Sequence, residues 1–167
     1  MVKPYREKGG RGMPAPDVSH ARNAICICVD AVSTGSFRGR LYHRYAPAPV
    51  LFDGAEHLLL AAETLFDNWN YPQPGLLARS FSPRPAQRGN TCMDRQPIED
   101  LSGHTGGRAT FTVQVAYRQN ATWQGTVTWL EEGKQSHFRS ALELIKLMDS
   151  ALEETSPPGD KPSAAFS

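Results

Sequence analysis

The sequence repeats its own pattern at a fixed offset. When the chain is slid by 86 positions, residues 25–66 align with residues 111–152 without a gap. The identical pairs are Val29 with Val115, Gly39 with Gly125, Phe52 with Phe138, Ala55 with Ala141, and Leu58 with Leu144. The same structural pattern therefore recurs in the same order and at the same spacing, which predicts an internal duplication. Two unrelated units that share a common short pattern are the alternative.

Each unit begins with a predicted β-hairpin. Residues 25–29 and 111–115 alternate apolar and less apolar side chains with a period of two, which is the pattern of a half-buried strand. A turn and a second strand are expected to follow each of them, at 37–45 and at 123–131. The pattern also allows a short third strand, at 49–52 and at 135–138.

Each unit ends in a predicted amphipathic helix, because apolar residues recur at helical spacing on one face. The two stripes are Ala55, Leu58, Leu59, Ala62, Leu65, Phe66 and Trp69, and Ala141, Leu144, Ile145, Met148, Ala151 and Leu152. Asp53 is placed to cap the first helix, and Ser136 or Ser140 the second. One unit of about 45 residues can hardly bury enough surface alone. We therefore expect an α+β fold in which two hairpin(-strand)-helix units share one core about a pseudo-two-fold axis.

The remaining segments lack a sustained periodic pattern. They predict a flexible basic tail at residues 1–22, an irregular insert rich in Pro and Gly at 70–108, and a frayed C-terminal tail at 153–167. A chain of 167 residues has room for one ordinary domain. We therefore expect a single α+β domain at 23–152, with repeat one at 25–69 and repeat two at 109–152.

Composition and charge restrict the class of protein. The formal net charge of +1 excludes a polycation as a whole but allows a local basic patch. No apolar run reaches the roughly 18–20 residues that span a bilayer, and the N-terminus lacks the apolar stretch of a secretory signal. The three cysteines are an odd number, and we interpret them as reduced thiols of a cytoplasmic protein.

The sequence carries no motif typical of catalysis or cofactor binding. It has no G-x-S-x-G, Walker, H-E-x-x-H or dinucleotide motif, and its five histidines have no carboxylate partner at an informative spacing. Cys26 and Cys28 point to one side of a predicted strand, but no second pair completes a tetrahedral metal site. We therefore expect a protein that is not an enzyme and has no cofactor or metal.

The second predicted strand of the first unit has a basic face. The predicted binding residues are Arg38, Arg40, Tyr42 and Arg44 on this face, and Arg79, Arg84 and Arg88 in the insert. Arginine makes bidentate contacts with phosphate, and tyrosine offers a plane for base stacking. This combination predicts a surface for nucleic acid, either free or within a protein–nucleic acid complex. A solvated face that prevents aggregation is the alternative.

Duplicated hairpin-and-helix units around a pseudo-dyad resemble the PUR-repeat and Whirly modules. The resemblance is architectural and covers residues 25–66 and 111–152. It rests on the hairpin plus helix and on residues 36–40, Ser-Phe-Arg-Gly-Arg, at the start of the second strand. Those families bind single-stranded nucleic acid on curved sheets, so the resemblance implies a similar partner. No motif matches residue by residue, and no site residue is carried over.

Three functions are open at this point. The first is a nucleic-acid-binding module, and the second is a protein-interaction module, such as an inhibitor or adaptor of a nucleic-acid-handling enzyme from a phage or mobile element. The third is a small-ligand binder with Trp123, Trp129 and Tyr117 around a pocket at the dyad, although the same aromatics are also suited to a core. A steep loss of affinity with salt would distinguish phosphate binding from an apolar interface.

Overall fold

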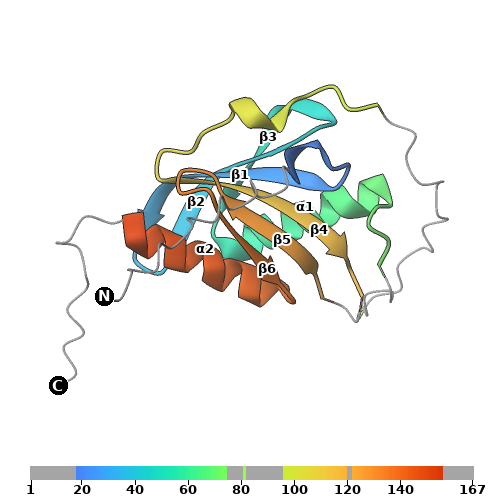
Figure 1. The fold of residues 1–167 in the computed structure, drawn as a ribbon. Helices are drawn as coiled ribbons and strands as arrows, with labels where there is room; N and C mark the ends of the chain where they lie inside the picture. Colours follow the sequence, from blue (N-terminus) through green and yellow to red (C-terminus); the bar gives the residue numbers. More distant parts are fainter. Residues whose placement is uncertain (1–17, 75–80, 82–95, 120–121, 156–167) are drawn as a thin grey trace, which may run out of the picture.

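The structure is a computed structural model that describes residues 18–74, 81, 96–119 and 122–155. Two units follow one another along the chain, and each consists of three strands and a helix. The elements are the 3-10 turns η1 (Val18–His20) and η2 (Leu101–Gly103), the strands β1 (Ala24–Ser33), β2 (Ser36–His43), β3 (Ala46–Asp53), β4 (Ala109–Tyr117), β5 (Gln124–Trp129) and β6 (Lys134–Phe138), and the helices α1 (Ala55–Trp69) and α2 (Ala141–Thr155) (Figure 1). This is the predicted α+β class, and both third strands are present. Neither helix is long and apolar enough to cross a membrane.

All six strands form one antiparallel sheet in the order β3-β2-β1-β4-β5-β6. The first strands of the two units, β1 and β4, pair at the centre of the sheet (Figure 1). The third strands, β3 and β6, form its two edges. Each unit therefore contributes one half of a continuous sheet.

Both helices pack against the same face of this sheet and share one hydrophobic core with it. Alternation along β1 and β4 directs Ile25, Ile27, Val29, Phe111, Val113 and Val115 into this core. Leu58, Leu144 and Met148 are buried, as predicted from the helical stripes. Ile145 was predicted to be buried but is only partly so, because it packs at the margin of the core.

The strand registers correspond between the units at the offset of 86 residues. Gly39 pairs with Phe52 in the first unit, and Gly125 pairs with Phe138 in the second. At the centre of the sheet Cys26 pairs with Thr112, the residue 86 positions later. The duplication itself and the pseudo-two-fold axis stay predictions, and superposition of residues 25–66 on 111–152 tests them.

The two matching glycines lie where neighbouring strands approach one another closely. A Cβ atom on Gly39 would lie 1.9 Å from the carbonyl oxygen of Cys28, and one on Gly125 would lie 1.9 Å from that of Gln114. The recurrence of glycine at this position of both units predicts that the sheet and helix layers approach closely there. The nearest atoms belong instead to the next strand, because the register shifts beside each glycine.

The two helix caps illustrate one correct and one wrong prediction. Ser140 caps α2, since its Oγ accepts a hydrogen bond of 3.0 Å from the backbone N–H of Glu143. The prediction that Asp53 caps α1 is wrong, because Asp53 still belongs to β3. Gly54 takes the cap position with a φ of 89°, a conformation that glycine adopts without strain.

Residues 96–108, which we call the strap, pack against the sheet face that the helices leave uncovered. Leu101 of the strap is buried there beside Cys26, Cys28 and Tyr42. The predicted irregular insert thus includes an ordered part that lacks a periodic pattern. The predicted N-terminal tail also has an ordered end, because Val18 is buried in η1, while residues 1–17 and 156–167 lie outside the described residues.

Candidate functional site

The predicted basic face is present on β2, on the side of the sheet that the strap covers. Arg38 is exposed there, while Arg40 and Arg44 are partly buried and Tyr42 is only 9% exposed. Arg44 lies just after the end of β2. The predicted contributions of Arg79, Arg84 and Arg88 lie outside the described residues.

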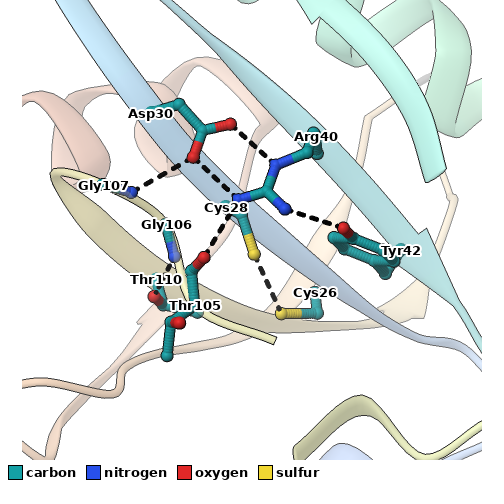
Figure 2. A network of polar contacts seen from close by, with 9 residues as sticks. All are labelled: Cys26, Cys28, Asp30, Arg40, Tyr42, Thr105, Gly106, Gly107 and Thr110. Carbon is teal, nitrogen blue, oxygen red and sulfur yellow. Dashed lines mark hydrogen bonds and ion pairs between the residues drawn. The ribbon is translucent and has the colours of Figure 1, made fainter. Parts of the chain in front are cut away.

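Arg40 is the centre of a polar network (Figure 2). Its Nε and Nη2 donate to the two carboxylate oxygens of Asp30 at 2.8 Å, Nη1 donates to the hydroxyl of Tyr42 at 2.8 Å, and Nη2 donates to the carbonyl oxygen of Thr105 at 3.0 Å. The hydrogen bonds from Arg40, together with one from the N–H of Gly107, lower the pKa of Asp30. Because a guanidinium has five N–H donors, Arg40 has little capacity left for a phosphate.

Tyr42 already stacks on a ring of the same chain. The imidazole of His104 lies parallel to it, with ring centroids 3.6 Å apart and an interplanar angle of 8°. A nucleic-acid base could use this face of Tyr42 only after His104 had moved away. The binding role predicted for Tyr42 therefore requires displacement of the strap.

Two glycines allow the strap to lie directly on β1. The N–H of Gly107 donates to Asp30 at 3.1 Å, and the N–H of Gly106 donates to the hydroxyl of Thr110 at 2.9 Å (Figure 2). A Cβ atom on Gly106 would lie 2.3 Å from the carbonyl oxygen of Ala109 and 2.6 Å from that of Val29. A larger residue would push the strap off the strand, so this contact depends on glycine.

Arg44 joins the end of β2 to both peripheral segments. Its Nη1 donates to the carbonyl oxygen of His20 in η1. Its own carbonyl oxygen accepts from the N–H groups of Ile98 and Glu99 in the strap, at 2.8 and 3.1 Å. Arg44 and Arg40 thus have structural contacts that their sequence pattern does not reveal.

Cys26 and Cys28 form a buried thiol pair under the strap, with their Sγ atoms 3.9 Å apart (Figure 2). The hydrogen bond between them lowers the pKa of Cys28 and raises that of Cys26, and burial raises the pKa of Cys26 further. Arg40 adds to the lowering at Cys28. No cluster of three metal-ligating side chains occurs in the part of the chain that the structure describes.

A groove of about 340 Å³ lies in the second unit, between β6 and the C-terminal half of α2. Its apolar lining residues are Phe111, Val127, Trp129, Leu147 and Ala151. Its polar lining residues are Lys134, Gln135, Ser136, Ser150 and Glu154. The groove therefore combines an apolar, partly aromatic surface with hydrogen-bonding and charged groups, as ligand-binding sites commonly do.

The corresponding end of the first unit is filled by aromatic side chains. Trp69, at the end of α1, is only 3% exposed. Its ring centroid lies 5.0 Å from that of Tyr45, 5.3 Å from that of His43 and 5.5 Å from that of Phe66. At the offset of 86 residues, Thr155 stands where the first unit has Trp69. The second unit therefore has no aromatic side chain at this position of α2.

The aromatic residues proposed to surround a pocket at the dyad do not line one cavity. Trp129 lines the groove, whereas Trp123 packs against Phe66 and donates its Nε1–H to Glu63 at 2.5 Å. Tyr117 is exposed and lines a separate pocket at the far end of β4. Small-ligand binding at the dyad stays a prediction, but these three aromatic residues do not form the lining that we expected for it.

Sequence reasoning also missed Arg118, which is only 2% exposed. Its guanidinium bonds the carbonyl oxygen of Pro72 at 2.7 Å and the carboxylates of Glu63 and Asp67 at 2.8 and 2.7 Å. These bonds join the end of β4 to the end of α1. No pattern of spacing in the sequence distinguishes this arginine from a solvated one.

Comparisons with protein-family models, with curated proteins and with solved structures gave no match. The architectural resemblance to PUR-repeat and Whirly modules stays a prediction.

Proposed function

We propose that the protein is a binding module that receives an extended segment of a partner protein in the groove between β6 and α2. The observation that carries this proposal is the position of the groove, which lies beside an edge strand that contains no proline. Of the functions considered from the sequence, this corresponds to the protein-interaction module.

The two edges of the sheet differ in how well they are protected. Pro47 and Pro49 lie on the edge strand β3, and each removes a backbone N–H that a further strand would need. No strand among the described residues pairs with the outer edge of β6. Its shortness and Lys134 limit uncontrolled self-pairing.

The groove offers selectivity for the side chains of such a segment. Successive side chains of an extended segment point in opposite directions, so alternate ones can enter the groove. The apolar surface of the groove includes Trp129 and Leu147. Its volume of about 340 Å³ is enough for one large side chain. Burial of one side chain of the segment favours a defined peptide over a random one.

Nucleic-acid binding through β2 stays a prediction with less support. Arg38 is exposed, but Arg40 and Tyr42 are engaged by Asp30 and His104. A nucleic acid would have to replace these contacts before it could use the face. Fluorescence anisotropy with labelled single-stranded DNA and RNA at low salt tests this alternative directly.

A selection of displayed random decapeptides on the full chain tests the proposal. The strongest peptide is then synthesised, and its affinity is measured with the wild type, with Ser150→Trp and with Leu142→Trp. Ser150 and Leu142 are both exposed residues of α2, but only Ser150 lines the groove. We expect Ser150→Trp to weaken binding at least about tenfold, because the indole blocks the groove, and Leu142→Trp to leave it unchanged. Failure to enrich any peptide, or equal binding by both variants, would contradict the proposal.

A further inference from the structure

The buried guanidinium of Arg118 has one nitrogen without a hydrogen-bond partner. Nε donates to the carbonyl oxygen of Pro72, and Nη1 donates to the carboxylates of Glu63 and Asp67. These bonds use three of the five N–H groups of the side chain. The other two belong to Nη2, which is buried and has no acceptor among the described residues. A buried donor has lost its hydrogen bonds to water, so an acceptor at Nη2 would be favourable.

A pocket of about 400 Å³ lies beside this nitrogen, at the end of β4. Its lining includes Tyr71, Pro72, Tyr117 and Arg118, and we call it the tyrosine pocket. Nε and Nη2 lie on the same edge of a guanidinium, as in Arg40, which bonds both oxygens of one carboxylate through these two nitrogens. This edge of Arg118 faces Pro72, so Nη2 lies on the side of the pocket. A ligand in the tyrosine pocket can therefore supply the acceptor.

The positive charge of Arg118 is already balanced. Glu63 and Asp67 do not line the tyrosine pocket, but both contact Nη1 directly, at 2.8 and 2.7 Å. An anionic ligand would be repelled by these two carboxylates, and a cationic ligand would be repelled by the guanidinium. Arg118 is the only residue with a formal charge in the described lining of the pocket. An uncharged carbonyl oxygen is therefore the acceptor that suits Nη2.

The two tyrosines supply a surface for the rest of a ligand. Tyr71 is 39% exposed and Tyr117 is 58% exposed, so both rings are accessible although they are largely apolar. Aromatic surface beside a small number of polar groups is common in sites for small molecules. Aromatic rings favour stacked or edge-to-face contact with another planar ring. The volume of the pocket is within the range of small-molecule sites.

We infer that the tyrosine pocket binds an uncharged planar ring compound with an amide or lactam carbonyl, whose oxygen accepts a hydrogen bond from Nη2 of Arg118. The ring of the ligand packs against Tyr71 and Tyr117. This inference is independent of the proposed function, because the groove between β6 and α2 shares no described lining residue with the tyrosine pocket.

Three small probes of similar shape test the chemistry. Nicotinamide is uncharged and has the carbonyl, nicotinate is an anion, and 3-methylpyridine has no oxygen. Each is titrated into the full chain labelled with ¹⁵N, and the guanidinium resonances of Arg118 are followed. We expect nicotinamide to shift the Nη2 protons downfield and to bind at least about tenfold more tightly than either other probe. Unchanged Arg118 resonances with excess nicotinamide, or equal binding of nicotinamide and either other probe, would overturn the inference.

A matched pair of variants tests the location without disturbing Arg118, whose bonds hold α1 to β4. Tyr117→Ala and Leu130→Ala each truncate an exposed side chain near the end of a strand, but Leu130 does not line the tyrosine pocket. We expect Tyr117→Ala to weaken the binding of nicotinamide at least about fivefold and Leu130→Ala to change it less than about twofold. Equal effects of the two variants would place the ligand elsewhere and overturn the inference.

Discussion

The first unit is closed at three places where the second unit is open. Its edge strand carries prolines, the end of its helix is filled by Trp69, and its sheet face lies under the strap. In the second unit the edge strand has no proline, and the groove lies near the end of the helix. Side chains on the other face of β5 and β6 are partly or fully exposed, namely Thr126, Thr128, Gln135 and His137. The same order of elements can thus give one half whose edge, helix end and sheet face are covered and another half with an open groove.

The largest expected effect tests whether the two halves depend equally on one core. Leu58 and Leu144 occupy matching positions on the two helices, and each is 1% exposed. Truncation to alanine should cost about 2–5 kcal/mol at either position, because each leaves a cavity in the shared core. Chemical denaturation of Leu58→Ala and Leu144→Ala measures this. A cost below about 0.5 kcal/mol for only one of them would contradict a shared core.

The next largest effect on stability is expected at the matching glycines, Gly39 and Gly125. Gly39→Ala and Gly125→Ala would each force a methyl group against a carbonyl oxygen of the neighbouring strand. We expect each substitution to destabilise the fold by about 1–3 kcal/mol, with similar values in the two units. Thermal unfolding followed by circular dichroism is the measurement. Tolerance at one site only would show that the close approach of the strands is not equivalent in the two units.

Substitutions of Arg38 and Arg40 test which arginines of the basic face also stabilise the fold. Arg40→Ala should cost about 1–2 kcal/mol, because it breaks a bidentate ion pair and two further hydrogen bonds across the sheet and the strap. Arg38→Ala should change stability by less than about 0.5 kcal/mol, since Arg38 is exposed. Urea denaturation of the two variants side by side tests the difference. If both substitutions changed the stability equally little, the contacts of Arg40 would not stabilise the fold, and Arg40 would be available to a ligand.

A single substitution should make the second unit resemble the first. Ala151 lines the groove and corresponds, at the offset of 86 residues, to Leu65 of α1. Ala151→Leu should fill part of the groove and change stability by less than about 1 kcal/mol. The affinity for the selected peptide should fall at least about tenfold. Retained affinity in a folded variant would show that the groove does not receive the ligand.

The smallest expected effect is a dependence of stability on pH that belongs to the first unit. Burial lowers the pKa of His43 below its ordinary value of 6.5, and the His43 Nδ1 accepts the N–H of Tyr45 at 3.2 Å. The unfolded chain therefore takes up the proton first as the pH falls. This contribution to stability is complete above about pH 6.5 and is lost as the pH falls toward the lowered pKa. Denaturation between pH 7 and 5 should show a smaller loss for His43→Phe than for the wild type.

Local patterns were sufficient for the helices and strands. The alternation that begins at Ile25 and at Phe111 gives β1 and β4, and the helical stripes give α1 and α2 close to their observed limits. Gly35 has the positive φ, 73°, that a tight turn between β1 and β2 requires. These features depend on residues that are close together in the sequence, so they can be predicted from a single sequence.

The contacts that decide which surfaces are available are long-range and leave no periodic signal. His104 lies far from Tyr42 in sequence, and nothing in the spacing of the strap predicts that their rings stack. Arg118 is buried by residues of α1 and by Pro72, which precede it by several elements. The groove is lined by residues of β4, β5, β6 and α2, which lie in separate parts of the sequence. The basic face was therefore recognised in the sequence, but its coverage and the groove were not.

Chemical-shift mapping tests the difference between the two units most directly. The full chain labelled with ¹⁵N is titrated with the selected decapeptide, and the backbone amide shifts are followed. We expect the largest changes in β6 and in the second half of α2, including Gln135 and Ser150, and little change in β2, β3 and the strap. Changes centred on Arg38, Arg40 and the strap, with β6 unaffected, would contradict it.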